Sequence, residues 1–167
     1  EKVFFDIVNS KKEISHEFII QIHDNLMENI DKRKGYRVHD IRVFKSQFEA
    51  TPFPYIKADI EILLKWHKKY EDKLHPLVLA GIFHQKFEKI HPFSDGNGRT
   101  GRIILCYMLI NKNYPPLIIR KSTRGNYLET MSIGNRADLG EIKPNYYNDL
   151  IGYLAEELIN SYWNNFN

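Results

Sequence analysis

Apolar residues recur at helical spacing along most of this chain. The interval of three to four residues, which marks one face of a helix, predicts helices over residues 15–30, 55–71, 76–90, 97–111, 123–134 and 145–163. Ser15 can cap the first of these helices, and Pro76 stands at the start of the third. The pattern therefore predicts a mainly helical fold.

One segment departs from helical spacing. Apolar and polar side chains alternate over residues 36–48, and β-branched residues are frequent there. Because this period of two is typical of strands, we expect a short β-hairpin. Two prolines in residues 51–54 then predict a stiff, extended connector. No repeat or low-complexity linker divides the chain, so residues 1–167 are predicted to form a single domain.

Composition narrows the class of protein. Hydrophobic residues make up 43% and charged residues 27%, as in globular domains. No apolar run approaches the ~20 residues of a spanning helix, so we expect no membrane partner. The net charge of +3 is spread over small groups rather than a basic stripe, so we expect no nucleic-acid partner. The lone Cys106 and the lack of a signal-peptide pattern favour a cytoplasmic location.

Residues 91–102, between the third and fourth predicted helices, combine groups that suit phosphate chemistry. His91 is a side chain that can act as a base near neutral pH, and Asp95 offers the oxygen ligand that Mg²⁺ prefers. A glycine-rich turn that opens a helix directs backbone N–H groups at an anion. Arg99 and Arg102 share one helix face and can bind further phosphate oxygens. These parts indicate transfer of a phosphorus group from a nucleotide to a hydroxyl.

The same segment resembles the signature of the Fic (filamentation induced by cAMP) family, His-x-Phe-x-Asp/Glu-Gly-Asn-Gly-Arg-x-x-Arg. Its fixed positions are matched by His91, Phe93, Asp95, Gly96, Asn97, Gly98, Arg99 and Arg102. An ordinary turn between two helices would explain the Asp-Gly and Asn-Gly pairs, but neither the histidine nor the arginines. The resemblance covers about residues 15–160. It implies a Fic-type helical bundle with the short β-hairpin as a flap beside the active-site loop.

The resemblance implies a Mg²⁺-dependent protein adenylyltransferase, which transfers AMP from ATP to a Ser, Thr or Tyr hydroxyl of a target protein and releases pyrophosphate. His91 would be the catalytic base, Phe93 would fix its direction from the core, and Asp95 would hold the metal. The residues implied in nucleotide binding are Gly96, Asn97, Gly98, Arg99, Arg102, Tyr127 and Asn135. The target would dock as an added strand along the hairpin near 36–48.

Two positions refine this expectation. The death-on-curing branch of the family has a lysine at the position of Gly98 and transfers the γ-phosphate, so Gly98 favours transfer of AMP. Tyr127 and Asn135 lie in a late helix that resembles the one meeting adenine in the family. We expect Asn135 to hydrogen-bond adenine and Tyr127 to line its pocket.

Many Fic proteins restrain themselves through a helix with the pattern Ser/Thr-x-x-x-Glu-Gly/Asn, whose glutamate pairs with the second motif arginine. No glutamate of this chain has Ser or Thr four residues earlier. Because the chain begins at Glu1 rather than Met, we expect a fragment that lacks an upstream regulatory segment. An inhibitory helix there, or an antitoxin-like separate chain, would meet Arg102. Without it, we expect the fragment to be more active than its parent.

Other functions stay open on the sequence. One alternative keeps the same pocket but uses UTP or a choline phosphodiester as donor, or removes AMP from targets. A catalytically silent binding module would have no need of His91, Asp95, Arg99 and Arg102 together. A nucleic-acid-binding helical domain has only the net charge in its favour. No zinc-ligand spacing surrounds His84, so we interpret it as a core histidine or as one that supports the site residues from behind.

Overall fold

The computed structural model describes residues 7, 9–42 and 49–163. Its α-helices are α2 (His16–Met27), α3 (Ile56–Tyr70), α4 (Pro76–Ile90), α5 (Asn97–Ile110), α6 (Arg124–Gly134) and α7 (Asn148–Trp163). Short 3-10 helices span Phe53–Tyr55, Lys121–Thr123 and Pro144–Tyr146. The described residues contain no strand. The prediction of a mainly helical fold is therefore confirmed.

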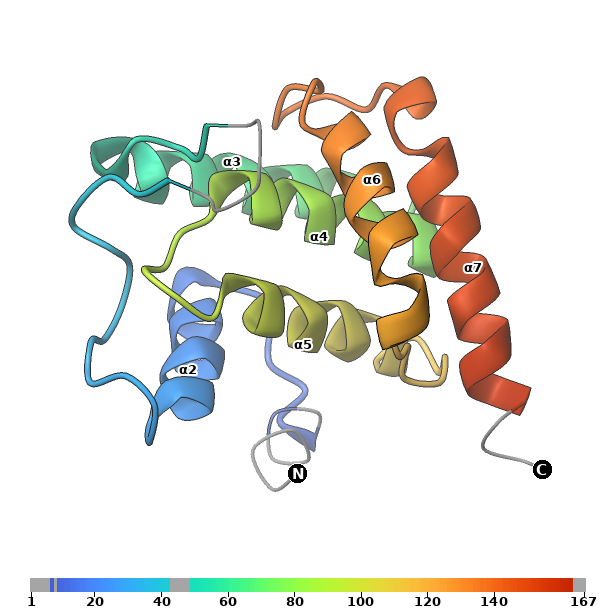
Figure 1. Ribbon diagram of the computed structural model, residues 1–167, viewed down its shortest axis with the longest axis horizontal. Coiled ribbons are helices and arrows are strands. Elements are labelled where there is room, and N and C mark those ends of the chain that lie inside the picture. Colours follow the sequence, from blue (N-terminus) through green and yellow to red (C-terminus); the bar gives the residue numbers. More distant parts are fainter. Residues whose placement is uncertain (1–6, 8, 43–48, 164–167) are drawn as a thin grey trace.

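The helices α4 and α5 pack against each other at the centre of the molecule (Figure 1). Helix α2 packs on α5, whereas α3 and α7 pack on α4, and α6 packs on α7. Because α4 is covered from several directions, even Lys86 and Gln85 on it are buried. The residues that join α4 to α5, here called the α4–α5 loop (residues 91–96), therefore start and end on the two innermost helices.

The predicted helix starts agree with the observed caps. Ser15 Oγ accepts a hydrogen bond from the Phe18 N–H at 3.2 Å, and Pro76 is the first residue of α4. Helix α7 begins later than predicted, because Pro144–Tyr146 first forms a 3-10 turn. In the described part of the chain, no helix is long and apolar enough to cross a bilayer.

The β-hairpin predicted over residues 36–48 is not confirmed. Residues 36–42 contain no strand, and residues 43–48 lie outside the described residues. The backbone N–H of Arg37 donates to the Pro92 carbonyl oxygen, and its guanidinium Nε donates to the His91 carbonyl oxygen, both at 2.9 Å. This part of the segment is therefore hydrogen-bonded to the α4–α5 loop instead of to a partner strand.

The extended connector predicted over residues 51–54 is wrong in its second half. Phe53–Tyr55 forms a 3-10 turn that leads directly into α3. The Phe53 N–H donates to Asp40 Oδ1 at 2.9 Å, and Thr51 Oγ1 donates to Asp59 Oδ2 at 2.6 Å. These side-chain acceptors favour a tight turn over the extended backbone that the prolines alone would allow.

Candidate active site

The α4–α5 loop is shaped by two residues in left-handed backbone conformations. His91 ends α4 with φ 52° and ψ 60°, and Gly96 precedes α5 with φ 80°. A positive φ is uncommon for a residue with a side chain, and such strain is typical of functional sites. At Gly96 a Cβ would lie 2.9 Å from Met27 Sδ, so the position needs glycine for its conformation and for its space.

Asn97 locks the loop from within. Its side chain is buried, with Oδ1 accepting from the Phe93 N–H at 2.9 Å and Nδ2 donating to the Phe93 carbonyl oxygen at 2.8 Å. The side-chain amide is thus engaged by the loop itself. Asn97 can therefore take its predicted part in phosphate binding only through its backbone N–H. This N–H lies in the first turn of α5, where helix N–H groups have no intrahelical acceptor.

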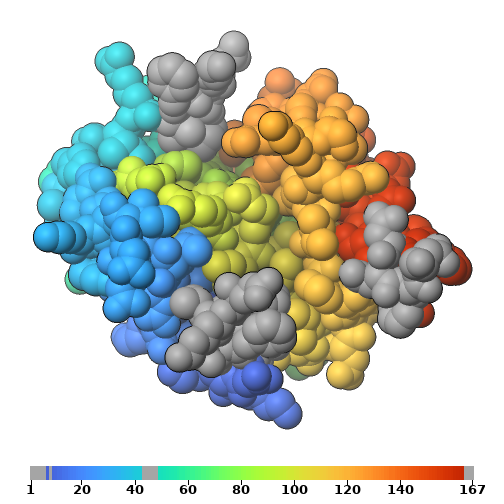
Figure 2. All heavy atoms as spheres, turned by 60° about the horizontal axis from the view of Figure 1, so that its bottom comes forward, coloured from blue at the N-terminus to red at the C-terminus, as the bar shows by residue number. Residues whose placement is uncertain are grey.

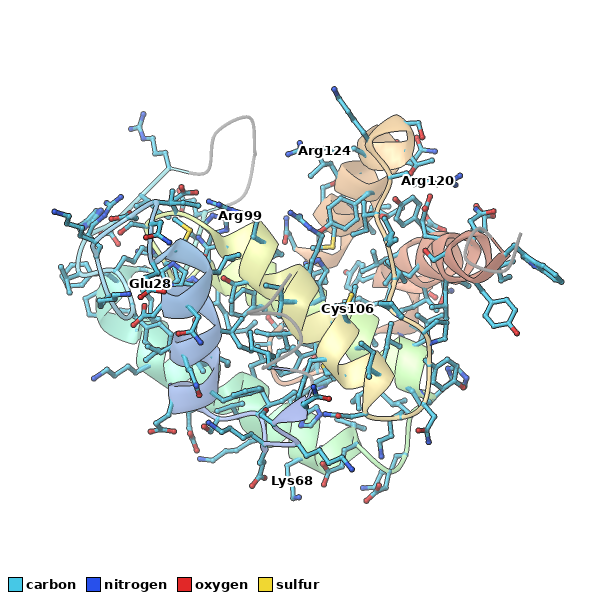
Figure 3. All side chains as sticks on the ribbon, turned by 90° about the horizontal axis from the view of Figure 1, so that it is seen from below. Glu28, Lys68, Arg99, Cys106, Arg120 and Arg124 are labelled. Atoms are coloured by element: carbon cyan, nitrogen blue, oxygen red, sulfur yellow. The ribbon has the colours of Figure 1, made fainter. Side chains whose placement is uncertain are left out.

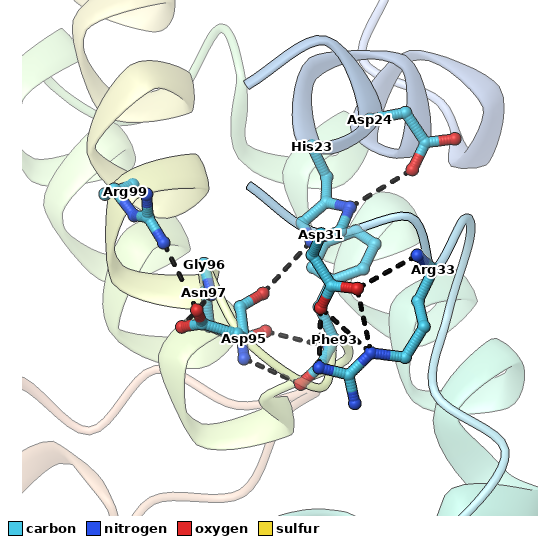
Figure 4. A network of polar contacts seen from close by, with 9 residues as sticks. All are labelled: His23, Asp24, Asp31, Arg33, Phe93, Asp95, Gly96, Asn97 and Arg99. Atoms are coloured by element: carbon cyan, nitrogen blue, oxygen red, sulfur yellow. Dashed lines mark hydrogen bonds and ion pairs between the residues drawn. The ribbon is translucent and has the colours of Figure 1, made fainter. Parts of the chain in front are cut away.

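Helix α2 supports the loop through His23, a residue that no sequence motif singled out. Its ring stacks on the buried ring of Phe93 with 3.7 Å between centroids and 4° between planes. His23 Nε2 lies 3.0 Å from the Asp95 carbonyl oxygen, and Nδ1 lies 3.1 Å from Asp24 Oδ1 (Figure 4). Since a carbonyl oxygen only accepts, Nε2 is the donor. Phe93 is buried as expected, and His23 fixes it.

His91 is held as the tautomer that a base requires. Its Nδ1 lies 3.1 Å from the backbone carbonyl oxygen of Glu88 and donates to it, so a neutral ring carries its lone pair on Nε2. Burial lowers the pKa of His91, while the Glu88 carbonyl oxygen acts in the opposite direction. The imidazole is therefore neutral at pH 7 and can accept a proton.

Asp95 presents a carboxylate at the rim of the loop. Its side chain is 61% exposed, Oδ1 accepts from the Gly96 N–H at 2.6 Å, and Oδ2 lies 3.4 Å from Arg99 Nη2. No group of three or more metal-ligating side chains occurs among the described residues. Mg²⁺ is commonly held by one or two carboxylates together with substrate phosphates. Asp95 therefore fits Mg²⁺ when a nucleotide supplies the remaining oxygen ligands.

A cavity of ≈ 590 Å³ opens beside these groups. Four arginines and one carboxylate meet in it, so its charge favours an anion. Arg42 comes from the segment before α3 and Arg124 from the start of α6. The lining residues are Ile41, Arg42, His91, Ser94, Asp95, Gly96, Asn97, Gly98, Arg99, Arg102 and Arg124. In Figure 2 the yellow-green residues of this region are exposed between α2 in blue and α6 in gold and orange.

Sequence reasoning missed Arg42 and Arg124 because neither belongs to a motif and both are distant in sequence from residues 91–102. Figure 3 shows Arg99 at the start of α5 and Arg124 at the start of α6 on the same side of the molecule. Single arginines are common in any sequence, so nothing marked these two as part of a site. Only the fold brings them to the cavity.

Tyr127 and Asn135 do not line this cavity. Tyr127 is 4% exposed, and its hydroxyl lies 2.6 Å from Nε2 of the buried His84. Asn135 Oδ1 accepts from Gln85 Nε2 at 2.8 Å. Burial, with Arg102 nearby, lowers the pKa of His84 to about 3, so this histidine is a neutral core residue, as expected. The adenine contacts of Tyr127 and Asn135 stay a prediction.

Beneath the cavity lies a carboxyl group that the sequence did not single out. Glu88 belongs to the last turn of α4, and its Oε2 is 4.0 Å from His91 Nδ1. Its Oε1 is buried without a hydrogen-bond partner. Burial raises the pKa of Glu88 to about 7, against the lowering effect of Arg102.

Known proteins resemble this chain in sequence. The Fic/DOC family profile matches residues 13–109. The protein adenylyltransferase Fic of Aedes aegypti is 32% identical over 138 residues, which are 80% of this chain and 27% of that protein. The protein adenylyltransferase fic-1 of Caenorhabditis elegans is 29% identical over 133 residues, 79% of this chain and 26% of that protein. The chain thus spans about a quarter of the length of these relatives.

Solved structures agree at the level of the fold. A Fic-domain-containing signalling protein from Bacteroides thetaiotaomicron superimposes with a TM-score of 0.80 and 24% identity, over 95% of this chain and 64% of that one. IbpAFic2 in complex with adenylylated Cdc42 gives a TM-score of 0.70 and 16% identity, over 96% of this chain and 53% of that one. With the family profile matched over more than half of its length, the chain belongs to the Fic/DOC family.

Proposed function

We propose that this chain is the catalytic domain of a protein adenylyltransferase that transfers AMP from ATP to a Ser, Thr or Tyr hydroxyl of a target protein. One observation carries the proposal. A base with its Nδ1 proton anchored, His91, lines the same cavity as the glycine-rich start of α5 and four arginines. A base beside an anion site is what transfer from a triphosphate to a hydroxyl requires. Relatives named protein adenylyltransferases support the same reaction.

His91 acts on the nucleophile. Its Nε2 accepts the proton of the attacking hydroxyl, and the hydroxyl oxygen forms a bond to the α-phosphorus of ATP. The bond from that phosphorus to the oxygen of the leaving pyrophosphate breaks with its electron pair. General-base catalysis of this kind contributes roughly 10²- to 10⁴-fold in rate.

The start of α5 and its arginines bind the phosphates. Gly96, Asn97 and Gly98 line the cavity. A Cβ at Gly98 would lie 3.2 Å from Arg102 Nη1. Glycine therefore lets the guanidinium approach the helix start closely, where it adds positive charge to the helix dipole. Arg99 and Arg102 bind the β- and γ-phosphates. Mg²⁺ held by Asp95 would neutralise further phosphate charge.

The target and the control of the reaction are part of the proposal. IbpAFic2 is described in complex with adenylylated Cdc42, which is a protein target of that relative. By analogy, this chain takes a target protein that docks near residues 36–48, where Arg42 lines the cavity edge. An inhibitory glutamate from a longer chain, or from an antitoxin-like partner, would bind Arg102 and compete with the γ-phosphate.

Self-labelling with ATP radiolabelled at the α-phosphate, in the presence of Mg²⁺, tests this function. We expect label on the wild type and none on His91→Ala, which should still bind nucleotide. Excess UTP should not compete. Nucleotide binding without α-label would indicate a different donor or the reverse reaction, and no nucleotide binding would overturn the enzymatic function.

A further inference from the structure

The side chain of Glu88 lies near Nδ1 of His91. Glu88 precedes His91 by three residues on α4, so both its backbone and its side chain face the same ring nitrogen. The backbone carbonyl oxygen accepts from Nδ1 at 3.1 Å, and the side-chain Oε2 lies 4.0 Å from the same atom. The carboxyl thus lies on the side of the ring opposite to Nε2, which is the atom that would receive the proton.

The other side of the carboxyl faces α5. A Cβ at Gly101 would lie 2.7 Å from Glu88 Oε1, and a Cβ at Gly98 would lie 3.9 Å from it. The same Gly98 position is 3.2 Å from Arg102 Nη1. Glu88 therefore occupies space that two glycines of α5 leave open, directly under the helix turn that carries Arg102.

The surroundings of this carboxyl contain few groups that can offset its charge. On α4, His84 is neutral because its pKa is about 3, and on α6 burial raises the pKa of Tyr127 well above its usual range. Arg102 on α5 lowers the pKa of Glu88, and His91 becomes a second cation once it is protonated. His91 itself is affected by Arg37, which lowers its pKa, and by Asp95, which raises it. Since a buried carboxyl oxygen without a hydrogen bond is costly, packing alone does not explain Glu88.

We propose that Glu88 is a positioning residue for the base: its carboxylate stabilises the imidazolium that forms when His91 takes the proton of the attacking hydroxyl. This inference rests on the proposed adenylyl transfer. An anion near Nδ1–H holds the tautomer with the lone pair on Nε2 and makes that nitrogen more basic, the logic by which a buried carboxylate assists a catalytic histidine. The step adds no bond to Glu88, whose charge is unchanged through the transfer.

A titration of His91 tests the interaction without any need for activity. We compare NMR titrations of the His91 ring in the wild type and in Glu88→Gln, without nucleotide and metal. Glutamine keeps the shape of the side chain but carries no charge. We expect the midpoint of the His91 titration to lie at lower pH in the variant, because a carboxylate 4.0 Å from Nδ1 favours the imidazolium in the wild type. Coinciding curves would overturn the proposal.

Kinetics test the same charge during the reaction. At pH 8, above the pKa of about 7 of Glu88, the carboxylate predominates in the wild type. We expect Glu88→Gln to lower kcat by about tenfold, the equivalent of one pKa unit of stabilisation, with no rise in KM for ATP. In the wild type, kcat should fall on the acidic side with a midpoint near pH 7, the pKa of Glu88. In Glu88→Gln this midpoint, the acid limb of the profile, should move to lower pH, toward the lowered pKa of His91. A raised KM with unchanged kcat would assign Glu88 to nucleotide binding and overturn the proposal.

Two further variants separate charge from folding. Glu156→Gln removes the same charge from an exposed position on α7 and should leave both profiles unchanged. Glu88→Asp keeps the carboxylate, so its acid limb should stay close to that of the wild type; a limb as low as that of Glu88→Gln would contradict a role for charge. If the wild type shows no label from ATP, the proposed function fails. The NMR comparison needs no activity, so it still tests whether the charge of Glu88 acts on His91.

Discussion

At the scale of single residues, backbone conformation decides where the chemistry points. His91 and Gly96 have left-handed conformations at the two ends of the α4–α5 loop. The strain at His91 is tolerated because its N–H donates to the Phe87 carbonyl oxygen at 3.0 Å and its Nδ1 to that of Glu88. These hydrogen bonds orient Nε2, whereas Gly96 lets α5 begin close against α2.

Replacement of Gly96 by alanine should destabilise the domain by about 1–2 kcal/mol, the usual cost of a left-handed conformation with a Cβ. The added Cβ would also lie 2.9 Å from Met27 Sδ, which increases this cost. Urea unfolding measures the change. Gly152→Ala is the matched control: a Cβ there meets nothing within 4 Å inside α7, so it should stabilise by up to about 1 kcal/mol. Equal effects of both changes would contradict the requirement for glycine at position 96.

At the scale of elements, α2 acts as a support for the loop rather than as part of the cavity wall. His23 stacks on Phe93 and donates to the Asp95 carbonyl oxygen, so one side chain fixes two positions of the loop. The rigid ring pair transmits the position of α2 to the loop that carries Asp95 and the start of α5.

His23→Phe should separate the two contacts of His23. Phenylalanine keeps an aromatic ring on Phe93 but cannot donate to the Asp95 carbonyl oxygen. We expect the fold to survive and the rate of α-label transfer to fall by roughly tenfold or more, because small errors of position are costly in catalysis. Melting temperature and labelling rate are measured together, with His23→Ala as the variant that loses both contacts. A wild-type rate for His23→Phe would show that stacking alone suffices.

At the scale of the whole molecule, a buried lysine joins the centre to the α6–α7 connection. Lys86 on α4 donates to the carbonyl oxygens of Asp138 and Glu141, both at 2.8 Å, and its ammonium lies 5.3 Å from the Trp66 ring centroid and 5.6 Å from that of Tyr147. Lys89 donates to the Ala137 carbonyl oxygen at 2.6 Å. These contacts fix the residues that follow α6 to the central helix α4.

The charge of Lys86 should appear in the pH dependence of stability. Burial lowers its pKa in the folded state from 10.5 to about 8. Between these values the unfolded chain binds more protons than the folded one, so the contribution of Lys86 to folding rises with pH from about 8 to 10.5. We expect the unfolding free energy of the wild type, relative to Lys86→Met, to increase over this range. A difference independent of pH would show that Lys86 titrates normally.

The sequence determined the helices and the chemical motif, because both are local. Apolar spacing placed α2, α3 and α4 correctly, and residues 91–102 carried the family signature in consecutive positions. Local signals failed at residues 36–42, where alternation predicted a strand. There the backbone of Arg37 hydrogen-bonds to Pro92, which is distant in sequence.

Only the tertiary structure decided what surrounds the motif. His23, Glu88 and Arg124 come from three different helices, and none has a sequence pattern that marks it. Their roles arise from packing: α2 lies against α5, α4 against α5, and the start of α6 reaches the cavity. Periodicity reports which face of a helix is buried but not which residue of another helix it meets. The groups that orient and charge the site are therefore visible only in the folded chain.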